Sequence, residues 1–115
     1  MDTKLYKLEY LNSISGGDIE FVHDMIKTFV TNSPLEIRSI REKAADKNWL
    51  KTGEETHRFA SSLLLLGLDN LHQLATDIEN KVHQNQNIEL VPSLLEQLEL
   101  NCNLVITQLK NDFNV

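Results

Sequence analysis

The feature of this sequence that most constrains its fold is the spacing of its apolar residues, which recur every three or four positions along most of the chain. This spacing places them on one face of an α-helix, whereas the strict alternation of a half-buried β-strand is nearly absent. A clear example is the set Val22, Met25, Ile26 and Phe29. We therefore predict an all-α protein.

The N-terminal part contains a strong helix breaker. A short helical segment over residues 5–14 is followed by Ser15 and by the glycines Gly16 and Gly17, which favour a turn. Asp18 is placed to cap the helix that comes next, because its carboxylate can accept a hydrogen bond from the first turn. We expect a short N-terminal helix and then a longer, capped one.

A second break is predicted at Pro34. Ser33 and Glu36 have the spacing of a capping box, and proline fits the first position of a helix, where its missing N–H has no partner to lose. The sequence therefore predicts that one helix ends near Asn32 and that a separate helix continues to about Lys47.

The second half of the chain predicts three more helices. One begins near Asn48 and stops at Gly67, one covers about residues 71–82, and one runs from Val91 to about Phe113. Short connections between helices favour antiparallel neighbours. We predict an up-and-down antiparallel four-helix bundle with an extra short N-terminal helix, forming a single domain over residues 1–115.

Composition excludes several classes of function. The chain has 11 basic and 17 acidic residues and a net charge of −6, which argues against nucleic-acid binding because phosphate contacts need clustered Lys and Arg. The single cysteine, Cys102, cannot form an internal disulfide, and residues 1–6 show no apolar signal segment. The leucine run at 63–66 is far shorter than the ~20 apolar residues that span a bilayer. We expect a cytoplasmic protein with no membrane partner.

One histidine stands apart from the predicted core. Projected at about 100° per residue, Thr52, Phe59, Leu63 and Leu66 share one side of their helix. His57 points well away from the centre of that side. Its imidazole is therefore expected to be accessible to solvent.

The helical neighbours of His57 are small. They are Gly53 one turn before it, and Ala60 and Ser61 one turn after it. A glycine inside a helix costs about 1 kcal/mol relative to alanine, and the close approach of a partner would explain that cost. We interpret this ring of small residues as room for a bulky partner.

Three leucines project close to the direction of His57. They are Leu50, Leu64 and, if the helical path continues past Gly67, Leu68. Single exposed leucines are ordinary, but several around an accessible histidine indicate a docking patch. We predict that these leucines and Gly53 contact a partner.

Residues 57–62 read His-Arg-Phe-Ala-Ser-Ser, and residues 66–68 read Leu-Gly-Leu. This pattern resembles the signature of the histidine phosphotransfer (HPt) domain family, which has a histidine, a small Gly-Ser segment and a later Leu-Gly pair. The resemblance implies a four-helix bundle whose histidine carries a phosphoryl group between the aspartates of receiver domains. By position, His57 would be the phospho-acceptor, and Glu79 would contact its imidazole.

The resemblance also implies the partners and the source of catalysis. The partners would be response-regulator receiver domains and a hybrid histidine kinase. Mg²⁺ would be bound by the receiver, and the chain itself would hold no cofactor and no metal. We expect a monomeric carrier without enzymatic activity of its own.

Two positions depart from the family signature. Ala60 stands where the family has a lysine, and Ser61 stands where it has a glycine. The lysine would offset phosphate charge. Arg58 is the neighbouring candidate substitute, although it points about 100° away around the helix. An uncompensated Ala60 predicts slower transfer or a less stable phosphohistidine.

Two other functions remain open at this point. One is a helical adaptor that binds receiver domains without being phosphorylated, which Ala60 would favour. The other is a metal-binding enzyme, for which His23, His72 and His83 lack ligand spacing. We interpret these three histidines as surface residues, and Cys102 as a packed core thiol.

Overall fold

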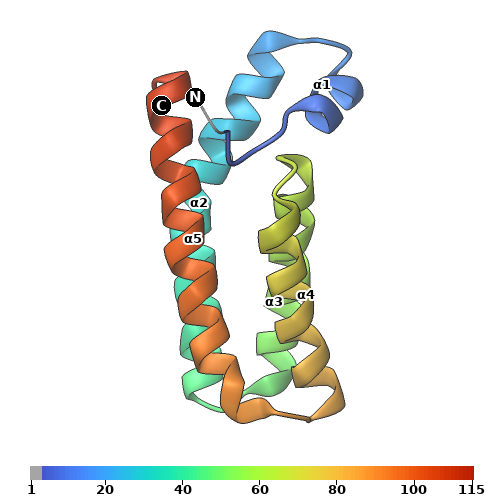
Figure 1. The fold of residues 1–115 in the computed structure, drawn as a ribbon, viewed down its shortest axis with the longest axis vertical. Helices are drawn as coiled ribbons and strands as arrows, with labels where there is room; N and C mark the ends of the chain where they lie inside the picture. The colour runs from blue at the N-terminus through green and yellow to red at the C-terminus, as the bar shows by residue number, and fades with distance from the viewer. Residues whose placement is uncertain (1–3) are drawn as a thin grey trace.

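The computed structural model describes residues 4–115, which fold into a bundle of long helices without any strand (Figure 1). In chain order the elements are α1 (Glu9–Ser15), α2 (Ile19–Ala45), α3 (Trp49–Leu65), α4 (Asp69–Gln84), a 3-10 turn η1 (Ile88–Leu90) and α5 (Val91–Phe113). Successive long helices run in opposite directions, and the short α1 lies at one end of the bundle (Figure 1). The predicted all-α, up-and-down bundle with a short N-terminal helix is confirmed.

The four long helices enclose one apolar core. Helix α3 packs most extensively against α4, while α2 contacts both α3 and α5, and α5 also contacts α4. Each long helix therefore has two neighbours and presents its remaining face to solvent. The core contains the largest fully buried side chains of the described chain, among them Phe59, Ile26, Ile37, Leu63, Ile78 and Leu95.

Polar caps begin two of the helices where the sequence predicts them. The Asp18 carboxylate accepts a hydrogen bond from the Phe21 N–H at 3.1 Å, at the start of α2. The Asn48 side chain accepts from the Lys51 N–H at 3.3 Å, at the start of α3. These bonds satisfy backbone donors that have no partner within the helix. The predicted starts near Asp18 and Asn48 are confirmed.

The predicted break at Pro34 is wrong, because α2 continues through this residue to Ala45. A proline inside a helix costs about 3 kcal/mol, since it removes a hydrogen bond and crowds the preceding turn. The buried positions of α2 nevertheless keep one helical stripe across the proline: Val22, Ile26, Phe29, Ser33, Ile37, Ile40 and Ala44. Burial of this stripe against α3 and α5 offsets the local cost, so tertiary packing overrides the capping signal.

The chain before α1 forms an extended segment, which we call the N-terminal strap (residues 4–8). The helix predicted over residues 5–14 is therefore too long at its start, since α1 begins at Glu9. The Lys7 N–H donates to the Leu66 carbonyl at 2.8 Å, and the Leu5 N–H donates to a Gln108 side-chain oxygen at 2.6 Å. The strap thus ties the end of α3 to α5, and its backbone bonds replace those of a helix.

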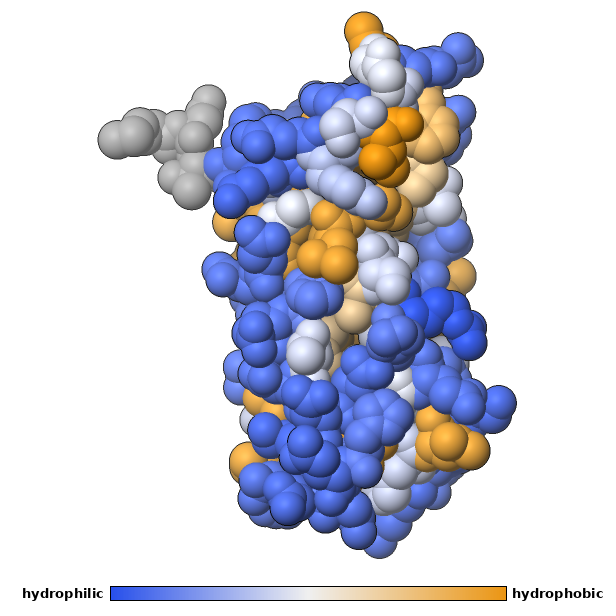
Figure 2. Space-filling model, turned by 90° about the vertical axis from the view of Figure 1, so that its right-hand side faces the viewer, coloured by the Kyte–Doolittle hydropathy of each residue, from blue (hydrophilic) through white to orange (hydrophobic). Residues whose placement is uncertain are grey.

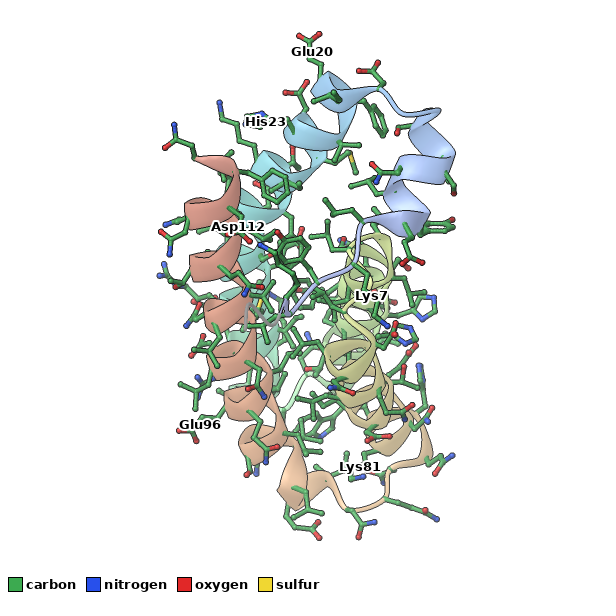
Figure 3. All side chains as sticks on the ribbon, turned by 45° about the horizontal axis from the view of Figure 1, so that its top comes forward. Lys7, Glu20, His23, Lys81, Glu96 and Asp112 are labelled. Atoms are coloured by element: carbon green, nitrogen blue, oxygen red, sulfur yellow. The ribbon has the colours of Figure 1, made fainter. Side chains whose placement is uncertain are left out.

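The strap also makes a polar contact with Asp112, which Figure 3 labels near the end of α5. The Asp112 carboxylate accepts from the Lys4 ammonium at 2.8 Å and from the Tyr6 hydroxyl at 2.7 Å. These two donors hold the pKa of Asp112 below its ordinary value. Burial and the Asp112 carboxylate raise the pKa of Tyr6, so its phenol keeps its proton at neutral pH.

This contact predicts a pH dependence of stability. The pKa of Asp112 is lower in the folded protein than in the unfolded chain. Its ionised form therefore stabilises the fold at any pH above the pKa of the unfolded chain. This stabilisation is lost as the pH falls through the pKa of Asp112 in the folded protein. Urea unfolding at a series of pH values should show wild type more stable than Asp112→Asn at neutral pH. The difference in the free energy of unfolding between the two proteins should disappear as the pH is lowered. A difference that does not change with pH would contradict the prediction.

Cys102 is fully buried on α5, which confirms the prediction of a packed core thiol. Burial raises the pKa of Cys102 to about 12, and the Glu36 and Glu99 carboxylates add to the effect. Only the thiolate is nucleophilic, so its reactive fraction is roughly a thousandfold below that of an exposed thiol. We expect iodoacetamide to leave the native protein unmodified at pH 8 and to alkylate it in denaturant, as read by intact mass. Rapid alkylation of the folded chain would contradict this.

The surface is mostly hydrophilic. Figure 2 views the molecule from the side of α3 and α4, where apolar atoms form small areas among hydrophilic side chains and gather mainly toward the upper end. Within residues 4–115, none of the helices is both long and apolar enough to cross a bilayer.

Candidate functional site

The structure places His57 on the outer face of α3. Its side chain is 72% exposed, whereas Thr52, Phe59 and Leu63 on the opposite face are buried in the core. The same helix therefore anchors itself through one stripe and presents the imidazole through the other. The predicted exposure of His57 is confirmed.

Glu79, on α4, holds the His57 ring. His57 Nδ1 lies 2.8 Å from Glu79 Oε2, and the Glu79 side chain is only 17% exposed. An ionised carboxylate can only accept a hydrogen bond, so this contact favours the tautomer with the proton on Nδ1. The other ring nitrogen, Nε2, has no hydrogen-bond partner among residues 4–115. In the neutral ring its lone pair is therefore available as a nucleophile at the protein surface.

Gly53 does not face an open approach for a partner, which corrects the reason predicted for it. A Cβ atom at this position would lie 3.3 Å from Val82 Cγ1 and 3.6 Å from Cε1 of His83, both on α4. The contact with Val82 is tighter than ordinary van der Waals packing, and the contact with His83 is an ordinary one. The glycine therefore allows α3 and α4 to approach each other closely beside the site.

The leucines predicted around His57 divide into two groups. Leu50 is 71% exposed and Leu64 is 46% exposed; they lie two turns before and two turns after His57 on the same face of α3. Leu68 is only 2% exposed, so its predicted place in a docking patch is wrong. Helix α3 has already ended, and Gly67, with φ +63°, turns the chain so that Leu68 enters the core.

The other residues of the motif also take different positions. Ser61 is exposed, whereas Ala60 is buried. Arg58 is exposed, and it lines a surface pocket with Glu36. Burial raises the pKa of Glu36, and the Arg58 charge acts in the opposite direction. Arg58 is thus directed toward α2, and the structure does not bring it to the bond between His57 and Glu79.

One residue of the site was missed in the sequence, where it was interpreted as an isolated surface histidine. His83 Nε2 lies 3.4 Å from Glu79 Oε2, the same oxygen that contacts His57. The available signal was the spacing of Glu79 and His83, which are four residues apart and so share one face of α4.

The described residues, 4–115, contain no cluster of three or more His, Cys, Asp or Glu side chains arranged to hold a metal ion. What the geometry shows is an exposed imidazole, that of His57, in contact with the Glu79 carboxylate, which also contacts His83. Comparison with known protein families finds a match to the Hpt domain over residues 24–111, which covers His57, Glu79 and His83. The chain belongs to the Hpt domain family.

Membership in the Hpt family defines the general role of the chain. Hpt domains carry out histidine phosphotransfer in phosphorelay signalling, and they interact with the receiver domains of two-component systems. No curated protein and no solved structure matched this chain significantly.

Proposed function

We propose that this Hpt domain accepts a phosphoryl group on His57 from the aspartyl phosphate of one receiver domain and passes it to an aspartate of another. The observation that carries the proposal is the 2.8 Å contact between His57 Nδ1 and Glu79 Oε2. This contact supports the tautomer with the proton on Nδ1, in which the Nε2 lone pair faces solvent, where a receiver can reach it.

The chemistry of this step balances without a proton leaving Nε2. The Nε2 lone pair attacks phosphorus, the P–N bond forms, and the P–O bond to the receiver carboxylate breaks. The aspartate leaves as a carboxylate with the bonding electron pair. The phosphorylated ring then carries positive charge on its Nδ1 side, which the Glu79 carboxylate balances. The reverse sequence delivers the phosphoryl group to the next aspartate.

In this proposal the chain is a carrier and not an enzyme. Phosphoryl transfer requires in-line positioning and charge neutralisation, and a Mg²⁺ ion bound by the receiver would supply the charge. A hybrid histidine kinase would be the source of the phosphoryl group. The carrier would work in the cytoplasm as a monomer with no cofactor of its own.

A receiver would dock on the exposed row of α3 that surrounds His57. Leu50 and Leu64 supply apolar contact area at its two ends, and the small, exposed Ser61 keeps access to the ring open. Apolar anchors around a reactive polar group are typical of specific docking surfaces.

The test is to incubate the chain with a phosphorylated receiver domain and Mg²⁺, and to locate the transferred group by tandem mass spectrometry under alkaline conditions. We expect one acid-labile phosphoryl group, on the peptide that contains His57. Phosphate on another residue would reject the assignment of His57.

The second candidate function is an adaptor that binds receivers without accepting phosphate. Ala60 favours it, because a small buried side chain stands where the family signature has a lysine. Binding of the receiver, measured by calorimetry, without any acid-labile phosphate on the chain would establish the adaptor and exclude the carrier.

A further inference from the structure

The Glu79 carboxylate serves two histidines through one oxygen atom. Oε2 lies 2.8 Å from His57 Nδ1 and 3.4 Å from His83 Nε2. Both rings are mostly exposed, whereas the carboxylate between them is largely buried. An N–H group on the His83 ring therefore competes with the His57 Nδ1–H for the same carboxylate oxygen of Glu79.

The packing of α3 against α4 builds this arrangement. The ring of His83 lies over Gly53, with its Cε1 and Nε2 atoms 3.6 Å and 3.8 Å from where a Cβ would stand. Gly53 is one helical turn before His57 on α3, so the His83 ring occupies the surface directly beside the reactive ring. A side chain larger than a methyl group at position 53 would compete with the His83 ring for this space.

We propose that His83 is a positioning residue of the phosphotransfer site, acting through Glu79. By donating to Oε2, it limits the charge that the carboxylate offers to the Nδ1 proton of His57. This inference rests on the proposed function for its consequence, but the sharing of Glu79 exists in the unphosphorylated protein as well.

The consequence concerns how readily the phosphoryl group leaves. If the phosphorylated ring keeps its Nδ1 proton, the group that leaves when the P–N bond breaks is neutral imidazole, which is a good leaving group. A carboxylate next to Nδ1 favours this protonated form of the phosphorylated ring. His83 weakens this support and so prolongs the life of the phosphohistidine.

The test uses the variant His83→Leu, with His72→Leu on the same helix as the matched control. In the unphosphorylated protein, ¹⁵N chemical shifts of the His57 ring report the fraction of the tautomer with the proton on Nδ1. We expect this fraction to rise in His83→Leu and to stay at the wild-type value in His72→Leu.

The second readout is the lifetime of the phosphohistidine. We expect His83→Leu to shorten the half-life about threefold, the scale of one exposed charged contact, and we expect the conservative His83→Gln, which keeps an N–H donor, to restore it. Equal tautomer fractions and equal half-lives in His83→Leu and His72→Leu would overturn the inference. A tautomer shift in a chain that accepts no phosphate would instead overturn the carrier function and retain the role of His83 toward Glu79.

Discussion

Replacing His57 by glutamine is expected to abolish phosphorylation of the chain by a phosphorylated receiver. Glutamine has a similar size and keeps an N–H that can donate to Glu79, but its amide has no lone pair of comparable nucleophilicity. Because the His57 side chain is 72% exposed, we expect the free energy of unfolding to change by less than about 0.5 kcal/mol. Radiolabel transfer and urea unfolding measure the two effects separately.

The matched control for this experiment is His72→Gln, which makes the same chemical change on α4. His72 is partly exposed, and it has no contact with Glu79. The His72→Gln variant should accept the radiolabelled phosphoryl group at the wild-type rate. Label that persists in His57→Gln would show that another residue is the acceptor.

The second large effect is expected from Gly53→Phe, and it is an effect on folding. A Cβ alone would lie 3.3 Å from Val82 Cγ1 and 3.6 Å from the His83 ring, so a phenyl group at this position must push aside Val82 and His83 or separate α3 from α4. Overpacking of this kind costs about 1–3 kcal/mol. We expect the midpoint of urea unfolding to fall accordingly, and NMR signals of His83 to shift because its ring loses its place.

Ser61→Phe is the control, because it adds the same ring one turn after His57 on the same face of α3. Ser61 is exposed, so we expect the free energy of unfolding of Ser61→Phe to stay within about 0.5 kcal/mol of wild type. Its ring should instead hinder a docking receiver. Wild-type stability in Gly53→Phe would contradict the close packing of the two helices.

The sequence predicted best where the signal is local. The caps at Asp18 and Asn48, the glycine stop at Gly67 and the run of α5 each depend on a few neighbouring residues, and the structure confirms them. The exposure of His57 followed from helical projection alone. The contact with Glu79 followed from the family resemblance, because no local pattern relates two residues on different helices.

The sequence failed where packing decides. The break at Pro34 had the correct capping chemistry, but the buried stripe of α2 on either side of it is continuous, and that burial outweighs the local preference. Leu68 was projected from an α-helix that ends at Leu65. Its burial depends on the direction that the chain takes after the glycine turn, which a helical projection does not contain.

By itself, the sequence determined that this chain is a helical bundle with one accessible histidine, because the period of its apolar residues sets which face of each helix is buried. Only the tertiary structure decided what surrounds that histidine. Gly53, Glu79 and His83 meet because α3 and α4 pack closely side by side, and the distance between two helices depends on the side chains of both.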